Sequence, residues 1–140
     1  MKATKILAAI LVASLCVQSA SRADDKDEPK VEVRIPDTAD ALWSEIETKF
    51  KALGEVVTTK DAKATYTAAE TVEALVRAIP TKYPALAADK RKRVEGQVKN
   101  TARVLDDLHD AMSAGKADEA TKKLGQVEAA LKIIKSQVAK

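Results

Sequence analysis

The stretch VEGQVKNTARVLDDLHDAM, residues 94–112, places small or apolar side chains at alternating steps of four and three residues. The positions on this spacing are Val94, Val98, Thr101, Leu105, Leu108 and Met112. An α-helix turns once in about 3.6 residues, so these steps keep the side chains on one face. The stretch therefore predicts the core-facing side of a long helix, from about residue 86 to residue 113.

Three other segments repeat this spacing, at about residues 37–57, 61–78 and 117–138. Their recurring apolar positions include Trp43, Ile46, Phe50, Leu53, Val57, Tyr66, Ala69, Val72, Val76, Leu124, Val127, Leu131, Ile134 and Val138. One amphipathic helix cannot bury its apolar face alone, whereas four helices around one axis bury all four faces. We therefore expect an all-α protein whose residues 37–140 form an antiparallel, up-down-up-down four-helix bundle.

Residues that end or cap helices stand between these segments. Pro80 and Pro84 lack an N–H and disfavour helix in the residue before them, so they predict a break between the second and third helices. Gly115 suits the left-handed position that follows a helix, and Asp61 suits the cap that precedes one. Such short connections favour antiparallel neighbours.

The first 23 residues, MKATKILAAILVASLCVQSASRA, have the pattern of a cleaved secretory signal peptide. A start with two lysines precedes an apolar run at residues 6–17, and Ser21-Arg22-Ala23 resembles a cleavage site. The run has 12 residues, whereas a helix that spans a bilayer needs roughly 20. We therefore expect a periplasmic or secreted protein without a transmembrane segment in its mature chain.

Removal of residues 1–23 changes both the charge and the cysteine content of the chain. They carry three of the 24 basic residues and none of the 21 acidic residues, which leaves 21 of each sign. A mature chain without net charge has no general attraction for nucleic acid, so we expect no such partner. Cys16 is the only cysteine and leaves with this segment, which excludes disulfides and thiolate metal sites from the mature chain.

Residues 24–36, DDKDEPKVEVRIP, separate the signal peptide from the first helix. They begin with charged residues, and residues 30–35 then alternate polar and apolar side chains, as a strand does. The rest of the chain offers no second strand to pair with. We therefore predict a charged, extended N-terminal arm that packs along the bundle or along a partner.

The sequence DDLHDAM, residues 106–112, contains the only histidine and the only methionine apart from Met1. Asp106 and Met112 lie three residues before and after His109, on adjacent parts of one helix surface. An imidazole and a carboxylate bind divalent metals, so His109, Asp106 and Met112 form a candidate metal site. A strong site needs further ligands from another helix or chain. The alternative is a half-buried histidine at the core's edge, its positive charge favoured by Asp106.

Residues 90–93 form the one basic cluster, Lys90, Arg91, Lys92 and Arg93. Cations at the start of a helix oppose the helix dipole at a cost of a few tenths of a kcal/mol. We interpret the cluster as a candidate partner-binding site, suited to phosphate, lipid head groups or an acidic protein. The alternative is a solvated helix start that Asp89 and Glu95 partly balance.

The signal peptide, four helices, proline-bearing middle connection and final hairpin LDDLHDAMSAGKADEATKKL, residues 105–124, resemble the periplasmic four-helix cytochrome b family. This resemblance implies the same fold, and a haem held by a methionine early in the first helix and a histidine late in the last. Residues 40–57 contain no methionine, and residues 131–140 contain no histidine. His109 and Met112 lie on one helix and cannot reach an iron from opposite faces. We therefore do not expect haem.

The chain offers no pattern typical of an enzyme. Asp106 and Asp107 are adjacent on a helix and point apart, and no nucleophile accompanies His109 in sequence. We predict an exported, non-catalytic bundle that binds a small ligand or an exported or envelope protein, as a monomer or homodimer, without a resident cofactor. The alternative is a periplasmic metal-handling or haem-binding bundle that uses His109 and holds a divalent metal weakly.

Overall fold

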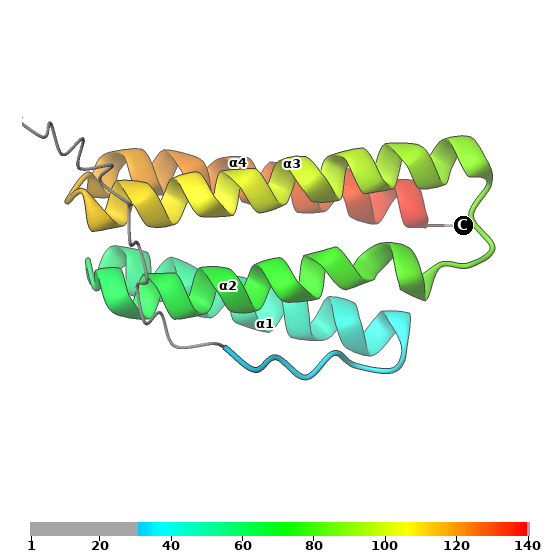
Figure 1. Ribbon diagram of the computed structural model, residues 1–140, viewed down its shortest axis with the longest axis horizontal. Coiled ribbons are helices and arrows are strands. Elements are labelled where there is room, and N and C mark those ends of the chain that lie inside the picture. The colour runs from blue at the N-terminus through cyan, green and yellow to red at the C-terminus, as the bar shows by residue number, and fades with distance from the viewer. Residues whose placement is uncertain (1–30, 140) are drawn as a thin grey trace, which may run out of the picture.

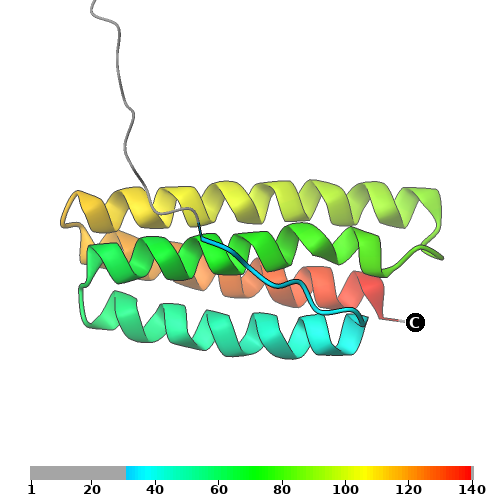
Figure 2. The same cartoon turned by 60° about the horizontal axis from the view of Figure 1, so that its bottom comes forward.

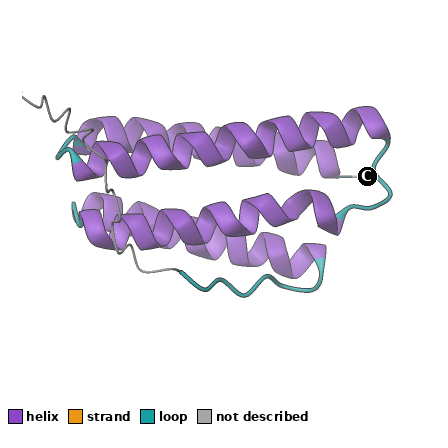
Figure 3. Cartoon of the chain, in the orientation of Figure 1, coloured by secondary structure: helices purple, strands orange, loops and turns teal. Residues whose placement is uncertain are grey.

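The structure is a computed structural model that describes residues 31–139, and every regular element in that range is helical. The elements are α1 (Ala39–Thr58), α2 (Ala62–Ala78), the short 3-10 helix η1 (Ile79–Lys82), α3 (Ala88–Ser113) and α4 (Ala117–Val138). The predicted all-α class with four long helices is confirmed, and no strand occurs among these residues (Figure 3). None of the helices described is long and apolar enough to cross a membrane.

The four helices form a bundle of two layers, with α1 and α2 in one and α3 and α4 in the other (Figure 1). The α1–α2 and α3–α4 turns lie at one end, and η1 lies at the opposite end. Every long helix contributes fully buried side chains to one core, which includes Leu42, Ile46, Leu53, Val72, Leu75, Val94, Leu105, Leu108, Val127 and Ile134. The repeated spacing in the sequence therefore marks the buried faces correctly.

The turns within the two layers have the same hydrogen-bond pattern. After α3, Gly115 has a φ of 73°, and the Lys116 N–H donates to the Ala111 carbonyl at 2.8 Å. After α1, Lys60 has a φ of 59°, and the Asp61 N–H donates to the Val56 carbonyl at 3.3 Å. Both are Schellman motifs, which satisfy carbonyls at the end of a helix. The sequence predicted the first from its glycine and missed the second.

Residues 31–36 belong to no helix or strand and lie against the bundle. Val33 and Ile35 pack against the core, while the alternate residues Glu32 and Arg34 are exposed. Figure 2 shows the segment crossing α2 towards the start of α1. The predicted signal peptide at 1–23 and the start of the arm lie outside the described residues.

The two layers meet along two seams, one between α2 and α3 and one between α1 and α4. The α2–α3 seam is closely packed, and the α1–α4 seam has the sparsest contact of the four neighbouring helix pairs. The distance between packed helices depends on the size of the side chains at the contact. The α1–α4 seam is therefore the more loosely packed of the two.

Candidate functional site

The α1–α4 seam contains a groove of about 280 Å³, here called the seam groove. Its apolar lining consists of Trp43, Ile46, Phe50 and Leu131. Its charged lining consists of Glu47, Lys51, Glu128, Lys132 and Lys135. Ligand sites in proteins are concave, mostly apolar and bordered by a few polar groups. The seam groove has these properties and lies just below the usual size range of about 300–1,000 Å³.

Trp43 lines the seam groove near the start of α1 and is held by contacts from two other elements. Its indole Nε1 donates a 2.8 Å hydrogen bond to the hydroxyl of Tyr83, in the loop after η1. The Lys135 ammonium of α4 lies 5.6 Å from the ring centroid and pairs with Glu47 at 2.5 Å. A cation over an indole face is attracted by the ring's quadrupole. Trp43 is thus fixed in position although the helices beside it pack loosely.

Two further hollows continue from the seam groove towards the η1 end of the bundle. The first, about 330 Å³, shares Trp43, Glu47 and Lys135 with the seam groove. The second, about 470 Å³ and here called the end pocket, shares Tyr83, Val138 and Ala139 with the first. The remaining lining of the end pocket is Lys82, Pro84, Ala85, Leu86, Ala87 and Lys90. The three hollows therefore form a continuous series along one side of the molecule.

The candidate metal residues lie on α3 but do not share one environment. Met112 is 5 % exposed and belongs to the hydrophobic core. His109 is half-buried, and its ring meets the Tyr66 ring of α2 edge-on, with 4.8 Å between centroids. Its Nε2 lies 3.1 Å from the Ser113 hydroxyl. Asp106 is exposed. His109 and Asp106 thus face α2, whereas Met112 faces the core.

Two acidic residues of α2 come close to Asp106, and sequence reasoning did not single them out. Glu70, Glu73 and Asp106 each offer a carboxylate oxygen within 4.8 Å of the others. Partial burial and then the nearby Glu73 charge raise the pKa of Asp106, while Arg77 opposes the shift. Arg77 also binds Glu73 directly, at 2.6 Å from its Nε. The available signal was helical spacing, because Glu70, Glu73 and Arg77 follow Tyr66 on one face of α2.

The basic cluster at residues 90–93 divides into one structural residue and three exposed ones. The Arg91 guanidinium donates to the carbonyls of Tyr83 and Pro84, at 3.2 and 2.7 Å, and so fixes the loop before α3. Lys90, Lys92 and Arg93 are exposed. Lys90 lines the end pocket. The cluster therefore lies beside the series of hollows, at the end of the bundle where α3 begins.

The described residues do not fit a haem. No histidine or methionine lines the seam groove or the two hollows that continue from it. His109 contacts α2 on the other seam, and Met112 is enclosed in the core. These hollows therefore do not provide the methionine and histidine ligands that the resemblance to the cytochrome b family implies.

Comparison with protein families, curated proteins and solved structures finds no match for this chain. The function must therefore be inferred from the two seams and the residues that line them.

Proposed function

We propose that the protein is an exported, non-catalytic four-helix bundle of antiparallel, up-down-up-down order that binds a small ligand along the α1–α4 seam. The seam groove carries this proposal, because it combines the loosest helix contact with two aromatic side chains, Trp43 and Phe50. The signal-peptide pattern of residues 1–23 supports a periplasmic or secreted location. An exported or envelope protein, or a second copy of the chain, would be the partner if the seam binds protein instead.

We propose no catalysis because the contacts of His109 do not form a working catalytic set. Ser113 and Asp110 flank it on α3, as a nucleophile and an orienting acid would. The distance from His109 Nδ1 to Asp110 Oδ1 is 3.6 Å, beyond the roughly 2.6–3.2 Å of such hydrogen bonds. These three residues line none of the three hollows. The set therefore lacks a firmly oriented base and lies outside these three hollows.

A neutral apolar dye tests the proposal directly. We expect Nile red to bind saturably to the folded protein, and Phe50→Asp to weaken this binding about tenfold, because a charge would enter the apolar lining. Ile133→Asp is the matched control, since Ile133 is an apolar residue of α4 that is 45 % exposed. Circular dichroism establishes first that both variants are folded. Equal dye affinity in the two variants would place binding outside the seam groove.

The second candidate function is the handling of a divalent metal at the α2–α3 seam. The observation that favours it is the approach of Glu70 and Glu73 to Asp106, one turn from His109. Carboxylates together with an imidazole suit zinc, nickel or copper. We expect a bound ion to raise the melting temperature, and Asp106→Asn to reduce that increase while Asp107→Asn does not. Unchanged melting of the parent protein with all three metals would eliminate this candidate.

A further inference from the structure

We infer that the ligand is a single anionic amphiphile: an unbranched apolar chain along the α1–α4 seam, with one acidic head group in the end pocket. The inference rests on the proposed function and specifies the chemistry of its ligand. It commits to a dissolved amphiphile molecule, rather than to the surface of a lipid bilayer. Shape, charge and an uncapped helix start support it.

The shape of the binding space favours a chain over a compact molecule. The end pocket, the hollow beside it and the seam groove have volumes of about 470, 330 and 280 Å³. Each shares lining residues with the next, so the space is long and divided. Leu86, Tyr83, Trp43 and Phe50 give it an apolar side from the end pocket to the seam groove. The middle hollow also carries the polar side chains Asp40, Ser44, Glu47 and Lys135. A flexible chain can follow such a series, whereas a broad planar ring cannot.

The charges along this space place the head group in the end pocket. In the seam groove, Lys135 pairs with Glu47 and Lys132 pairs with Glu128, so Lys51 is the one cation of that lining without an ion pair among the described residues. The end pocket is lined by two cations, Lys82 and Lys90, and by no acidic residue.

The start of α3 adds further positive potential at the same place. Ala87 provides no side-chain cap for the first N–H groups of α3, and uncapped N–H groups carry partial positive charge. The exposed Lys92 and Arg93 follow within the next turn, so the cations at this helix start outnumber Asp89, the one acid of its first turn. An acidic head group therefore offsets the cost of placing this basic cluster at a helix start.

Calorimetric titration of the purified protein with amphiphiles below their micelle-forming concentrations tests the inference. We expect dodecanoate to bind at least tenfold more tightly than dodecanol or dodecyltrimethylammonium. Affinity should rise along octanoate, decanoate and dodecanoate by about two- to fourfold for each methylene, because each one leaves water for the apolar lining. Trp43 emission should change in the same titrations, since the chain passes its ring.

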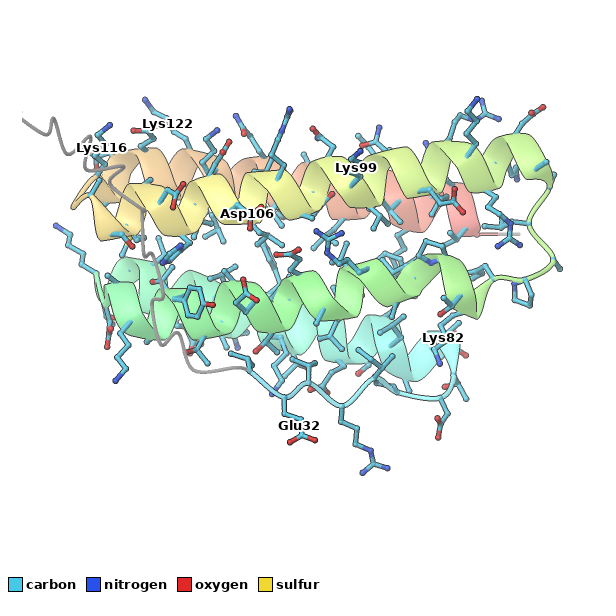
Figure 4. The ribbon with its side chains drawn as sticks, viewed as in Figure 1. Glu32, Lys82, Lys99, Asp106, Lys116 and Lys122 are labelled. Carbon is cyan, nitrogen blue, oxygen red and sulfur yellow. The ribbon has the colours of Figure 1, made fainter. Side chains whose placement is uncertain are left out.

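Paired lysine variants locate the head group. The double variant Lys82→Gln/Lys90→Gln should bind dodecanoate about fivefold more weakly and dodecanol equally well. The control Lys116→Gln/Lys122→Gln removes the same charge at the opposite end of the bundle, as Figure 4 shows for Lys82, Lys116 and Lys122, and should bind like the parent.

Three other outcomes would contradict the anionic amphiphile, and they differ in what they leave of the proposed function. Nile red binding without preference for dodecanoate, or equal loss in both double variants, would overturn the anionic ligand and leave the proposed function standing. Failure of every amphiphile and of Nile red to bind would overturn both. Binding to vesicles of anionic phospholipid without binding of dodecanoate would identify a membrane surface as the partner, and would contradict the inference.

Discussion

The two seams that join the layers arise from the same helical repeat and yet differ in almost every property. The α2–α3 seam is closely packed and carries charged and polar side chains, among them Glu73, Asp106 and His109. The α1–α4 seam is loosely packed, and its groove combines Trp43 and Phe50 with five charged side chains. Large side chains hold helices apart, and small ones let them approach. The α2–α3 seam also has a hollow of about 390 Å³, between Arg77 of α2 and the exposed side of α3, but its lining is polar and charged rather than aromatic.

The largest expected losses of stability come from truncating a leucine, and they should differ between the enclosed core and the α1–α4 seam. Leu108→Ala, at a side chain with 0 % exposure, should reduce the free energy of unfolding by about 3–5 kcal/mol, because it leaves an enclosed cavity. Leu131→Ala should cost only about 1–2 kcal/mol, because Leu131 is 8 % exposed and borders the seam groove, so solvent fills the space. Urea denaturation measures both, and equal losses would mean that the two sites are equally closed.

Close packing of the α2–α3 seam also predicts what happens when a small buried side chain there is enlarged. Ala102 lies two turns before His109, on the side of α3 that faces α2, and is 1 % exposed. Ala102→Leu should destabilise the protein by about 1–3 kcal/mol, because the added atoms have no space. Ala129→Leu, at an exposed alanine of α4, is the control and should change stability by less than about 0.5 kcal/mol. Thermal or urea unfolding distinguishes them, and a stabilised Ala102→Leu protein would show that the closed seam has room.

The sequence predicted the helices well because helical spacing is a local signal. The steps of three and four residues located the core face of all four helices, and Pro80, Asp61 and Gly115 marked breaks that the structure contains. The sequence placed Lys60 in the turn between the first two helices, but its left-handed conformation was not predicted, because the turn imposes it and the side chain opposes it.

The candidate site was harder to predict, because it depends on which helix faces which. His109 and Asp106 were identified from their rarity and spacing in the sequence. That Glu70 and Glu73 lie near Asp106 becomes visible only once α2 and α3 are packed together. The seam groove has no sequence signature at all. Trp43 and Phe50 follow the same repeat as fully buried residues, and only the relative spacing of α1 and α4 shows that they line a groove.

The hydrogen bond between Trp43 and Tyr83 tests whether the open seam is rigid. Trp43→Phe and Tyr83→Phe each remove one partner of the 2.8 Å bond. Each should destabilise the protein by about 1 kcal/mol, and the double variant should cost about 1 kcal/mol less than the sum, because the bond is lost only once. A double-mutant cycle in urea measures this coupling. Additive effects would show that the bond contributes nothing to stability.

The smallest expected effect is the change of stability with pH that Asp106 causes at the α2–α3 seam, and its direction can be predicted. Burial and the Glu73 carboxylate raise the pKa of Asp106, so the folded protein keeps this proton to a higher pH than the unfolded chain does. Stability therefore falls as pH rises from the ordinary aspartate pKa through the raised one, and the loss persists above that window. Asp106→Asn cannot ionise and should be more stable than the parent at neutral pH, by at most about 0.5 kcal/mol.

Asp107→Asn is the matched control for this variant, because the neighbouring carboxylate has the opposite role. Asp107 pairs with Lys123 of α4 at 2.7 Å, so its neutralisation should slightly lower the melting temperature at pH 7, whereas neutralisation of Asp106 should raise it. Below the raised pKa, Asp106 is protonated in the parent, and the advantage of Asp106→Asn should vanish there. Melting curves at several pH values measure both trends. A lower melting temperature for Asp106→Asn at neutral pH would mean that Asp106 stabilises the closed seam through Arg77 more strongly than Glu73 destabilises it.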